Sequence, residues 1–174
     1  MRGMEIRELD ADGVAGAIED LSEILVDCVA GGASVNFMWP FEMNDARPFW
    51  RGVVAAVRLG RNRLFVAEDD EGRVSGTVQL AFAQQPNQPH RAEITKMLVH
   101  RRARRRGLAD ALMAAAESAA LDCGRTLLVL DTASEDAKRV YERRAWVPAG
   151  TIPQYALNPD GTPCDTLIYW KRLG

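Results

Sequence analysis

The chain has 174 residues and a formal net charge of −2; hydrophobic residues make up 47% of it and charged residues 26%. This length predicts a single domain, residues 1–174, with a core large enough to fold alone. The near-balance of charge argues against a globally basic nucleic-acid-binding protein. No apolar run approaches the roughly 18 residues that a membrane helix needs. The N-terminal segment holds no apolar signal core, so we expect a cytoplasmic protein.

Three cysteines and two histidines leave little material for metal or redox chemistry. Cys28, Cys123 and Cys164 are too scattered for a disulfide framework or a zinc site, and we expect buried free thiols. The histidines are His90 and His100, which argues against a Ser-His-Asp hydrolase and against most zinc enzymes. The sequence therefore predicts no metal.

The N-terminal part of the chain predicts one strand and two helices. Met4–Leu9 has the pattern of a short strand. Apolar residues then recur at steps of three and four between Val14 and Cys28, as on one face of a helix, with Asp12 as its N-cap. The aromatic, proline-containing segment 33–43 predicts a packed loop, or alternatively the lining of a substrate pocket. A second helix is expected over Pro48–Leu59, because proline fits the first turn of a helix.

The rest of the chain predicts a sheet with two more helices. Six segments have the apolar pattern of strands: Arg63–Glu68, Arg73–Phe82, Arg91–His100, Thr126–Leu130, Val147–Ala156 and Thr166–Lys171. Helices are expected over Arg104–Cys123 and about Ser134–Arg144. Thr132 and Glu135 have capping-box spacing before the second of these helices. This order of elements predicts a mixed α/β sheet.

The most informative stretch lies between a predicted strand and a predicted helix, where five of the six residues from Arg101 to Arg106 are arginine. Such a run is often a solvated charged surface, and it can also be a nucleic-acid patch. A third interpretation is a phosphate cradle, in which unpaired backbone N–H groups and the positive end of a helix dipole face an anion. The strand-to-helix setting favours the cradle, and Gly107 lets the backbone approach a ligand closely.

These residues resemble a known family. The pattern R-x-x-G-x-A at 104–109 matches the (Q/R)-x-x-G-x-(G/A) acetyl-coenzyme A motif of the GNAT N-acetyltransferases. The preceding strand, Glu93–His100, is similar to the fourth strand of that family, and A-x-x-x-Y-E-x-x-A-W at 137–146 resembles its A-x-x-x-Y-E-K-x-G-F signature. The strong match covers about residues 91–147. Finer similarities point to bacterial members near the tabtoxin resistance acetyltransferase.

The resemblance implies the GNAT fold, an α/β fold with a mixed, mostly antiparallel sheet, flanking helices and a central parallel pair of strands, the fourth and fifth, that splay apart. It also implies acetyl-coenzyme A (acetyl-CoA) as co-substrate, whose thioester carbonyl the Met97 N–H would polarise. The implied coenzyme contacts lie on the fourth strand, on the loop and helix start that follow it, and at one further position: Met97, Leu98, Val99, Arg104, Arg105, Arg106, Gly107, Leu108, Ala109 and Ser134. Many members have Asn where this chain has Ser134.

The resemblance implies Tyr141 as the general acid, because a phenol can protonate the thiolate that leaves. Two carboxylates compete for the role of general base. Strand alternation places Glu93 on the same face as Met97 and Val99, unless a bulge intervenes. Asp131 follows the buried run 126–130, at the end of a strand where α/β sheets place ligands. Either carboxylate can also be purely structural.

The expected function is therefore acetyl transfer from acetyl-CoA to a primary amine, of a small molecule, by direct attack in a ternary complex. Acetylation of a protein N-terminus or lysine is an alternative within the enzyme class. A GNAT module that binds acetyl-CoA without catalysis, and nucleic-acid binding through Arg101 to Arg106, are alternatives outside it. We expect neither a nucleic-acid nor a membrane partner, and a monomer or homodimer.

Overall fold

The structure, a computed structural model, describes residues 4–69 and 71–174. Within these residues the frame is one seven-stranded sheet in the order β1-β2-β3-β4-β5-β7-β6, in which β4 and β5 run parallel and the other neighbours antiparallel. The strands are β1 (Glu5–Leu9), β2 (Asn62–Glu68), β3 (Val74–Phe82), β4 (Arg91–Val99), β5 (Leu127–Thr132), β6 (Val147–Leu157) and β7 (Pro163–Arg172). The helices are α1 (Ala11–Gly16), α2 (Ile18–Ala30), α3 (Met43–Arg58), the 3₁₀ helix η1 (Arg101–Ala103), α4 (Leu108–Asp122) and α5 (Glu135–Arg143). The predicted mixed α/β fold with a central parallel pair is confirmed.

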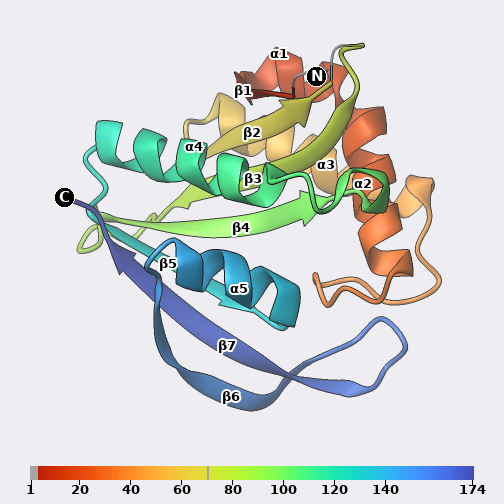
Figure 1. Cartoon of the computed structure of the whole chain (residues 1–174). Coiled ribbons are helices and arrows are strands. Elements are labelled where there is room, and N and C mark those ends of the chain that lie inside the picture. Colours follow the sequence, from red (N-terminus) through yellow and green to blue (C-terminus); the bar gives the residue numbers. More distant parts are fainter. Residues whose placement is uncertain (1–3, 70) are drawn as a thin grey trace.

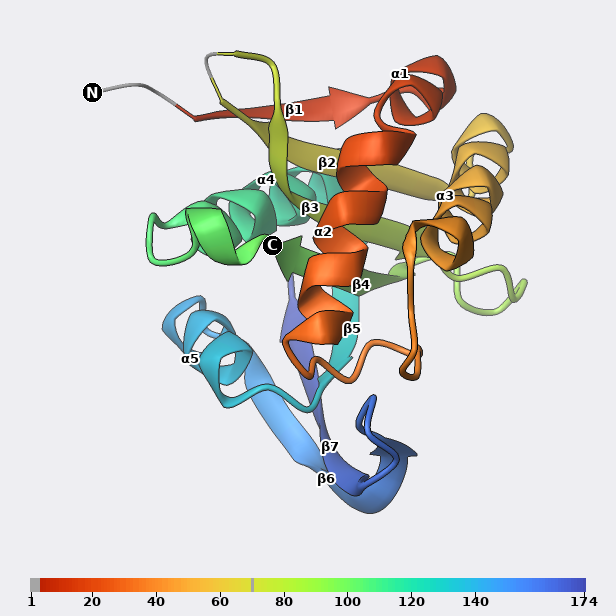
Figure 2. The ribbon, with the colours of Figure 1, turned by 90° about the vertical axis from the view of Figure 1, so that its right-hand side faces the viewer.

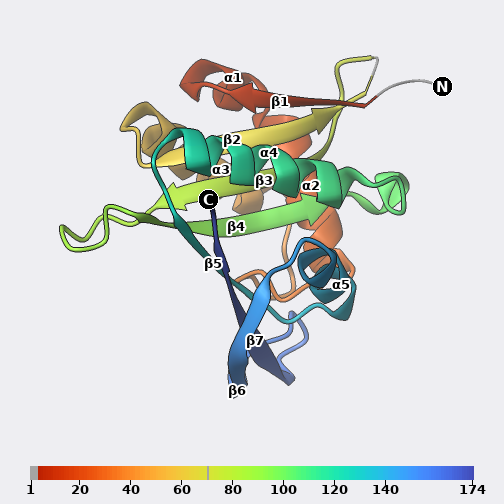
Figure 3. The same cartoon turned by 60° about the vertical axis from the view of Figure 1, so that its left-hand side comes forward.

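Helices cover both faces of the sheet. Figures 1 and 3 show α4 and α5 on one face, and Figure 2 shows α2 and α3 on the other. Two apolar clusters fill the layers. The cluster beneath α4 includes Leu112, Leu128 and Tyr141, and the cluster beneath α2 and α3 includes Leu21 and Trp50. Because burial of apolar surface is the dominant favourable term in folding, these two layers fix the sheet from both sides.

The pairing between β4 and β5 is short. Arg91–Glu93 of β4 stand opposite Leu127–Val129 of β5, and among the described residues no later part of β4 has a partner on β5. Figure 1 shows the two strands diverging from left to right beyond this pairing. The predicted splay between the fourth and fifth strands is therefore present.

A bulge interrupts β4 beyond that pairing. Gln79 of β3 stands opposite Thr95, and Thr77 stands opposite Leu98, so β4 has one residue more than β3 between these pairs. Lys96 lies in the bulge with a φ of +48°, a left-handed conformation that costs a non-glycine residue about 1–2 kcal/mol. Because side chains alternate along a strand, one extra residue reverses which face each later side chain takes.

The N-terminal helices differ from the prediction. The expected helix from Val14 to Cys28 is two helices, α1 and α2, and the N-cap is Asp10, not Asp12, because Asp10 Oδ1 accepts a hydrogen bond from the Gly13 N–H at 2.8 Å. α3 begins at Met43, upstream of Pro48, because Glu42 and Asp45 form a capping box that satisfies two backbone N–H groups. Proline is tolerated near a helix start but does not define it.

The start of α5 also differs from the prediction. Ser134 is its N-cap, and the Ser134 Oγ accepts a hydrogen bond from the Ala137 N–H at 3.2 Å. Thr132, which the capping-box spacing favoured, is the last residue of β5, where it and Asp131 pair with β7. Pairing with β7 thus extends the strand past the expected end at Leu130 and leaves the cap to the next polar residue.

A buried charge network ties α4 to the C-terminal part of the chain. Glu117 of α4 accepts hydrogen bonds from Arg144 Nη2 at 2.8 Å, Lys171 Nζ at 2.9 Å and Trp146 Nε1 at 2.8 Å. Burial raises the pKa of Glu117, but these donors outweigh burial and hold that pKa below its usual range. The carboxylate therefore stabilises the folded state only while it is ionised.

We expect Glu117→Gln to lower the free energy of unfolding by about 3 kcal/mol at neutral pH, because removing one partner of a buried ion pair costs about 3–5 kcal/mol and glutamine keeps some hydrogen bonding. The wild-type advantage is fully present above the ordinary glutamate pKa and is lost as the pH falls through the lowered pKa of the folded state. Urea unfolding at several pH values measures both effects. Asp122→Asn, at an exposed position of the same helix, is the control and should change stability by less than about 0.5 kcal/mol. A stability difference that does not depend on pH would contradict this role of Glu117.

Candidate active site

Two carboxylates share one face of the sheet where β4 and β5 part. Glu93 lies in the last registered pair of the two strands. Its neighbours Ala92 and Ile94 belong to the apolar cluster beneath α4, so alternation turns Glu93 to the other face. Leu130 belongs to the same cluster, so the next residue on β5, Asp131, also faces away from α4, and Asp131 is exposed. The structure thus brings together both residues predicted as candidate bases.

The charge of Asp131 acts on Glu93. Burial raises the pKa of Glu93, and the negative charge of Asp131 raises it further, whereas Arg91 and Lys96 lower it. A carboxyl group whose pKa is raised moves toward the range in which it can exchange protons near neutral pH. Glu93 therefore has the electrostatic setting of a proton acceptor, with Asp131 as the group that adjusts it.

Lys96 is a functional candidate that sequence reasoning missed. Its Nζ lies 5.5 Å from the centroid of the Phe49 ring on α3, a cation–π contact on the α2 and α3 side of the sheet. Burial lowers the pKa of Lys96, while the charges of Asp131 and Glu93 act in the opposite sense. Lys96 follows Thr95, and these two adjacent polar residues, which break the alternation of polar and apolar residues along the strand, were the available signal of a bulge.

The bulge overturns the expected position of Glu93 relative to Met97 and Val99. The side chains of Met97 and Val99 pack against the cluster beneath α4, the cluster to which Ile94 belongs, whereas Leu98 belongs to the cluster beneath α2 and α3. Glu93 therefore faces away from the Met97 and Val99 side chains. Residues 94–99 have no ladder partner on β5, and, apart from the Val99 carbonyl, which Arg104 and Cys28 contact, this edge remains open to an extended ligand that adds like a strand.

Tyr141 lies on the opposite face from the carboxylates, on α5. Its side chain is 4% exposed, and its ring packs against Trp146 and Tyr169, with centroids 6.1 and 5.9 Å away. Burial raises the pKa of Tyr141, and Asp131 and Tyr169 raise it further. Within the described part of the chain the Tyr141 hydroxyl has no hydrogen-bond partner. A phenol that stays protonated and unbonded is suited to donate a proton.

The loop before α4 presents unpaired backbone N–H groups. Arg105 (φ +60°) and Gly107 (φ +77°) are left-handed, and Gly107 is the N-cap of α4. Among the described residues, no acceptor pairs with the N–H groups of residues 105–109. This range includes Leu108, whose side chain is buried in the core, and Ala109. Consecutive N–H groups and the positive end of a helix dipole favour an anion at this point.

The arginines of this stretch fall into two groups. Arg101 pairs with a carboxylate of α2, and Arg102 and Arg104 each donate a hydrogen bond to a backbone carbonyl, at 3.1 and 3.3 Å. Arg105 and Arg106 are exposed and form no ion pair within residues 4–69 and 71–174. The first group holds the loop against the sheet, which leaves the second group available to a ligand.

Ser134 is the N-cap of α5. Its Oγ accepts the hydrogen bond from the Ala137 N–H, so its side chain already has a structural role. The contact between Ser134 and a coenzyme stays a prediction.

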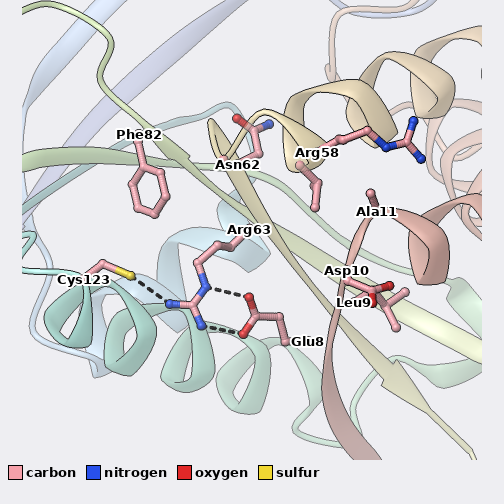
Figure 4. Close-up of a pocket in the computed structure, with 11 residues that line it drawn as sticks. Glu8, Leu9, Asp10, Ala11, Arg58, Asn62, Arg63, Phe82 and Cys123 are labelled. Atoms are coloured by element: carbon pink, nitrogen blue, oxygen red, sulfur yellow. Dashed lines mark hydrogen bonds and ion pairs between the residues drawn. The ribbon is translucent and has the colours of Figure 1, made fainter.

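A separate pocket lies away from the diverging strands, beside β1 and β2. Figure 4 shows it beside β1 and β2, near the C-terminal ends of α3 and α4; its volume is about 540 Å³. Arg63 donates hydrogen bonds there to Glu8 at 2.6 Å and to Cys123 Sγ at 2.9 Å. All three cysteines are free thiols, but only Cys28 is buried as expected. Cys164 is half-buried, and Cys123 is exposed because it follows the last turn of α4. None of the predicted site residues lines this pocket.

Comparisons with known proteins agree with this arrangement. The family model "Acetyltransferase (GNAT) family" matches residues 18–146. Among solved structures, an N-acetyltransferase from Staphylococcus aureus Mu50 is similar to the chain, with 19% identity, a TM-score of 0.80 and coverage of 99% of both chains. A GNAT superfamily phosphinothricin acetyltransferase from Sinorhizobium meliloti, in complex with acetyl-CoA, gives 16% identity and a TM-score of 0.80 over 98% of this chain and 89% of that one.

A third similar structure is the ribosomal-protein-alanine N-acetyltransferase from Brucella melitensis, with 22% identity and a TM-score of 0.76 over 97% of this chain and 99% of that one. Identities this low show a shared fold alone. The family model, by contrast, spans most of the sequence, including the loop before α4, the diverging strands and α5. On that match the chain belongs to the GNAT family of acetyltransferases.

Proposed function

We propose that this chain, as one domain over residues 1–174, transfers the acetyl group of acetyl-CoA to a primary amine of a small molecule by direct attack in a ternary complex. The observation that carries the proposal is the site where β4 and β5 diverge. Glu93 and Asp131 lie on one face of the sheet there, and Tyr141 lies on the other. The unpaired N–H groups of residues 105–109 lie in the loop after β4 and in the first turn of α4.

The coenzyme would bind along β4 and the loop that follows it. The N–H groups of residues 105–109 suit its pyrophosphate, with Arg105 and Arg106 adding positive charge. The open backbone edge at Met97 to Val99 suits the pantetheine arm. The Met97 N–H would then bind the thioester oxygen and stabilise the oxyanion as the amine attacks.

Proton transfer would use both faces of the sheet. Glu93 takes a proton from the acceptor ammonium on the face away from α4, and Asp131 adjusts its pKa and attracts the same cation. Tyr141 gives a proton to the departing thiolate on the other face. The raised pKa keeps the Tyr141 hydroxyl protonated and available as charge develops on sulfur. The same apolar surroundings disfavour a free thiolate and so promote its protonation.

The residues around the expected position of the acceptor suit a small amine. Phe37 and Phe41, from the loop expected to line a pocket, pack with Phe49 of α3; the ring centroids are 4.5 Å (Phe37–Phe41) and 5.6 Å (Phe37–Phe49) apart. Phe49 in turn contacts Lys96, beside the two carboxylates. A compact aromatic wall next to negative charge suits an ammonium with an apolar body.

The decisive experiment is a measurement of coenzyme A release from acetyl-CoA with a panel of small amines, free amino acids, and peptides with a free N-terminus or lysine. Turnover of small amines supports the proposal, and a preference for peptides would replace it with protein acetylation. Coenzyme binding without any turnover would leave a binding module. No helix in the described residues is long and apolar enough to cross a membrane. A cytoplasmic location, the absence of nucleic-acid partners, and a monomer or homodimer stay predictions.

Gly107→Glu should abolish acetyl-CoA binding in calorimetric titration, because it adds a negative charge where the pyrophosphate is expected. The matched control is Gly124→Glu at the other end of α4. Both glycines have left-handed φ, +77° and +70°, and a Cβ at either position meets no atom within 4 Å. Both variants should therefore lose about 1–2 kcal/mol of stability, but only the first should lose affinity. Equal affinities in the two variants would rule out the anion site before α4.

Tyr141→Phe should lower kcat by roughly 10²-fold with little change in acetyl-CoA affinity, because the hydroxyl acts when charge develops on sulfur. Thermal unfolding should show no loss of stability, because the hydroxyl makes no hydrogen bond to the described protein. Tyr169→Phe, which removes a hydroxyl that contacts Glu142 at 3.3 Å, is the control and should keep its kcat. Full activity of Tyr141→Phe would make Tyr141 a packing residue.

Asp131→Asn should lower the pKa of Glu93, because it removes a negative charge that opposes ionisation of Glu93. Lys96→Met should raise the same pKa. Carboxyl ¹³C NMR titration measures both shifts, with Glu135→Gln on α5 as a control that leaves Glu93 unchanged. If the Glu93 pKa does not respond to Asp131→Asn, the two carboxylates do not act as one site.

A further inference from the structure

The chain contains three lysines, and their ammonium groups differ sharply in what they contact. Lys171 Nζ donates to Glu117 at 2.9 Å and to the Arg144 carbonyl at 2.6 Å. Lys138 Nζ lies 3.9 Å from Glu135 on the surface of α5. Within the described residues Lys96 Nζ has neither a hydrogen bond nor an ion pair, and its contact is the Phe49 ring. Among the three lysines, Lys96 is thus the one whose amine forms no ion pair within the described residues.

The backbone places this amine at the site of acetyl transfer. Lys96 directly precedes Met97, whose N–H we assign to the thioester oxygen, and a trans peptide separates consecutive Cα atoms by about 3.8 Å. The contact with Phe49 puts the Lys96 side chain on the α3 side of the sheet. Glu93 and Asp131 lie on that same face, from which an acceptor amine would attack. The side chain thus reaches from the residue beside the thioester into the space of the acceptor.

We propose that Lys96 is a self-acetylation site, which takes the acetyl group from acetyl-CoA bound to the same chain when no acceptor amine occupies the site. The inference rests on the proposed function, because it uses the same coenzyme position. The chemical class of the modifying ligand is an acyl thioester. The product is an N-acetyl-lysine in the acceptor site.

The step balances without any further reactant. The lone pair of neutral Lys96 Nζ attacks the thioester carbonyl carbon, and the N–C bond forms as the C–S bond breaks. The carboxylate of Glu93 takes the proton lost from nitrogen, and Tyr141 protonates the coenzyme A thiolate. No atom changes its oxidation state. The step leaves Glu93 protonated and Tyr141 ionised, and proton exchange with solvent restores both, so the net products are acetyl-lysine and free coenzyme A.

The surroundings of Lys96 favour the neutral amine that this step needs. Burial lowers the pKa of Lys96, although Asp131 and Glu93 work against that shift. The contact with Phe49 holds the ammonium form and not the neutral amine, because a cation–π attraction depends on the charge. Loss of the proton therefore both creates the nucleophile and releases the side chain from the aromatic ring.

Acetylation of Lys96 would change the acceptor site. It removes the one positive charge that lowers the pKa of Glu93 from within the bulge, and it fills space beside Phe49. An acceptor amine that occupies the site should protect Lys96. The modified enzyme should accordingly turn over acceptors more slowly than the unmodified enzyme.

The test incubates the full chain with isotopically labelled acetyl-CoA in the absence of any amine, followed by peptide mass mapping. Trypsin should yield residues 92–101 as one fragment that carries a single labelled acetyl group, because acetylated Lys96 is no longer cleaved. Lys138 and Lys171 report background chemical acetylation in the same sample. Because proximity replaces a bimolecular step, Lys96 should be labelled at least about tenfold faster than Lys138. Coenzyme A release should stop near one equivalent per chain.

Three variants and one parallel assay separate the outcomes. Lys96→Arg should abolish the single-equivalent release, Lys138→Arg should keep it, and Tyr141→Phe should slow the labelling of Lys96 but not that of Lys138. Equal labelling of Lys96 and Lys138, or labelling unaffected by Tyr141→Phe, would overturn the proposal. Turnover of an amine panel with Lys96 unlabelled would overturn it while the proposed function stands. Failure to turn over any amine, with Lys96 also unlabelled, would count against both.

Discussion

The pairing of β4 with β5 holds for three residues on each strand and then ends. A ladder that continued would satisfy the backbone groups of residues 94–99 within the sheet, and no ligand would have a hydrogen-bonding edge there. The opening is tolerated because β5 has a second neighbour: every residue from Leu127 to Thr132 has a partner on β7. β5 therefore keeps its position without β4, and the unpaired edge of β4 becomes the place where an extended ligand can bind.

The bulge at Lys96 decides how the chemistry is divided between the two faces of the sheet. Before it, Glu93 faces away from α4; after it, Met97 and Val99 turn their side chains into the core beneath α4 and anchor the strand. The backbone at Met97 is thus held firmly while the side chain of Lys96 projects toward Phe49. A left-handed φ at a lysine costs about 1–2 kcal/mol, so the packing of Met97 and Val99 must offset it. The result places Tyr141 on one face of the sheet, and Glu93 and Asp131 on the other, as the proposed mechanism requires.

Local signals in the sequence predicted the parts of the site that depend on neighbouring residues. The pattern at 104–109 and Tyr141 within its helix were recognisable because a motif and its element are short-range features. Alternation predicted Glu93 on the face of Met97 and Val99 unless a bulge intervened, and only the register between β3 and β4 shows that the bulge is present. The contact of Lys96 with Phe49 joins residues far apart in sequence, and no periodicity indicates it. At α3, two local signals competed, and the capping box prevailed over Pro48.

The hydrogen bonds of Glu117 join α4, whose N-terminus presents the unpaired N–H groups, to the segment that follows α5, the helix of Tyr141. α4 presents the unpaired N–H groups at its N-terminus and carries Glu117 further along, where it binds Arg144, Trp146 and Lys171. Arg144 directly follows α5, the helix of Tyr141, and Lys171 lies on β7, the strand that holds β5. Acetyl transfer needs the phosphate-binding end and the acid held within about 0.5 Å of their working positions. One buried carboxylate thus links the helix start that presents the unpaired N–H groups to the segment that follows the helix of Tyr141. Under the proposed mechanism, loss of Glu117 should lower kcat even where the fold survives.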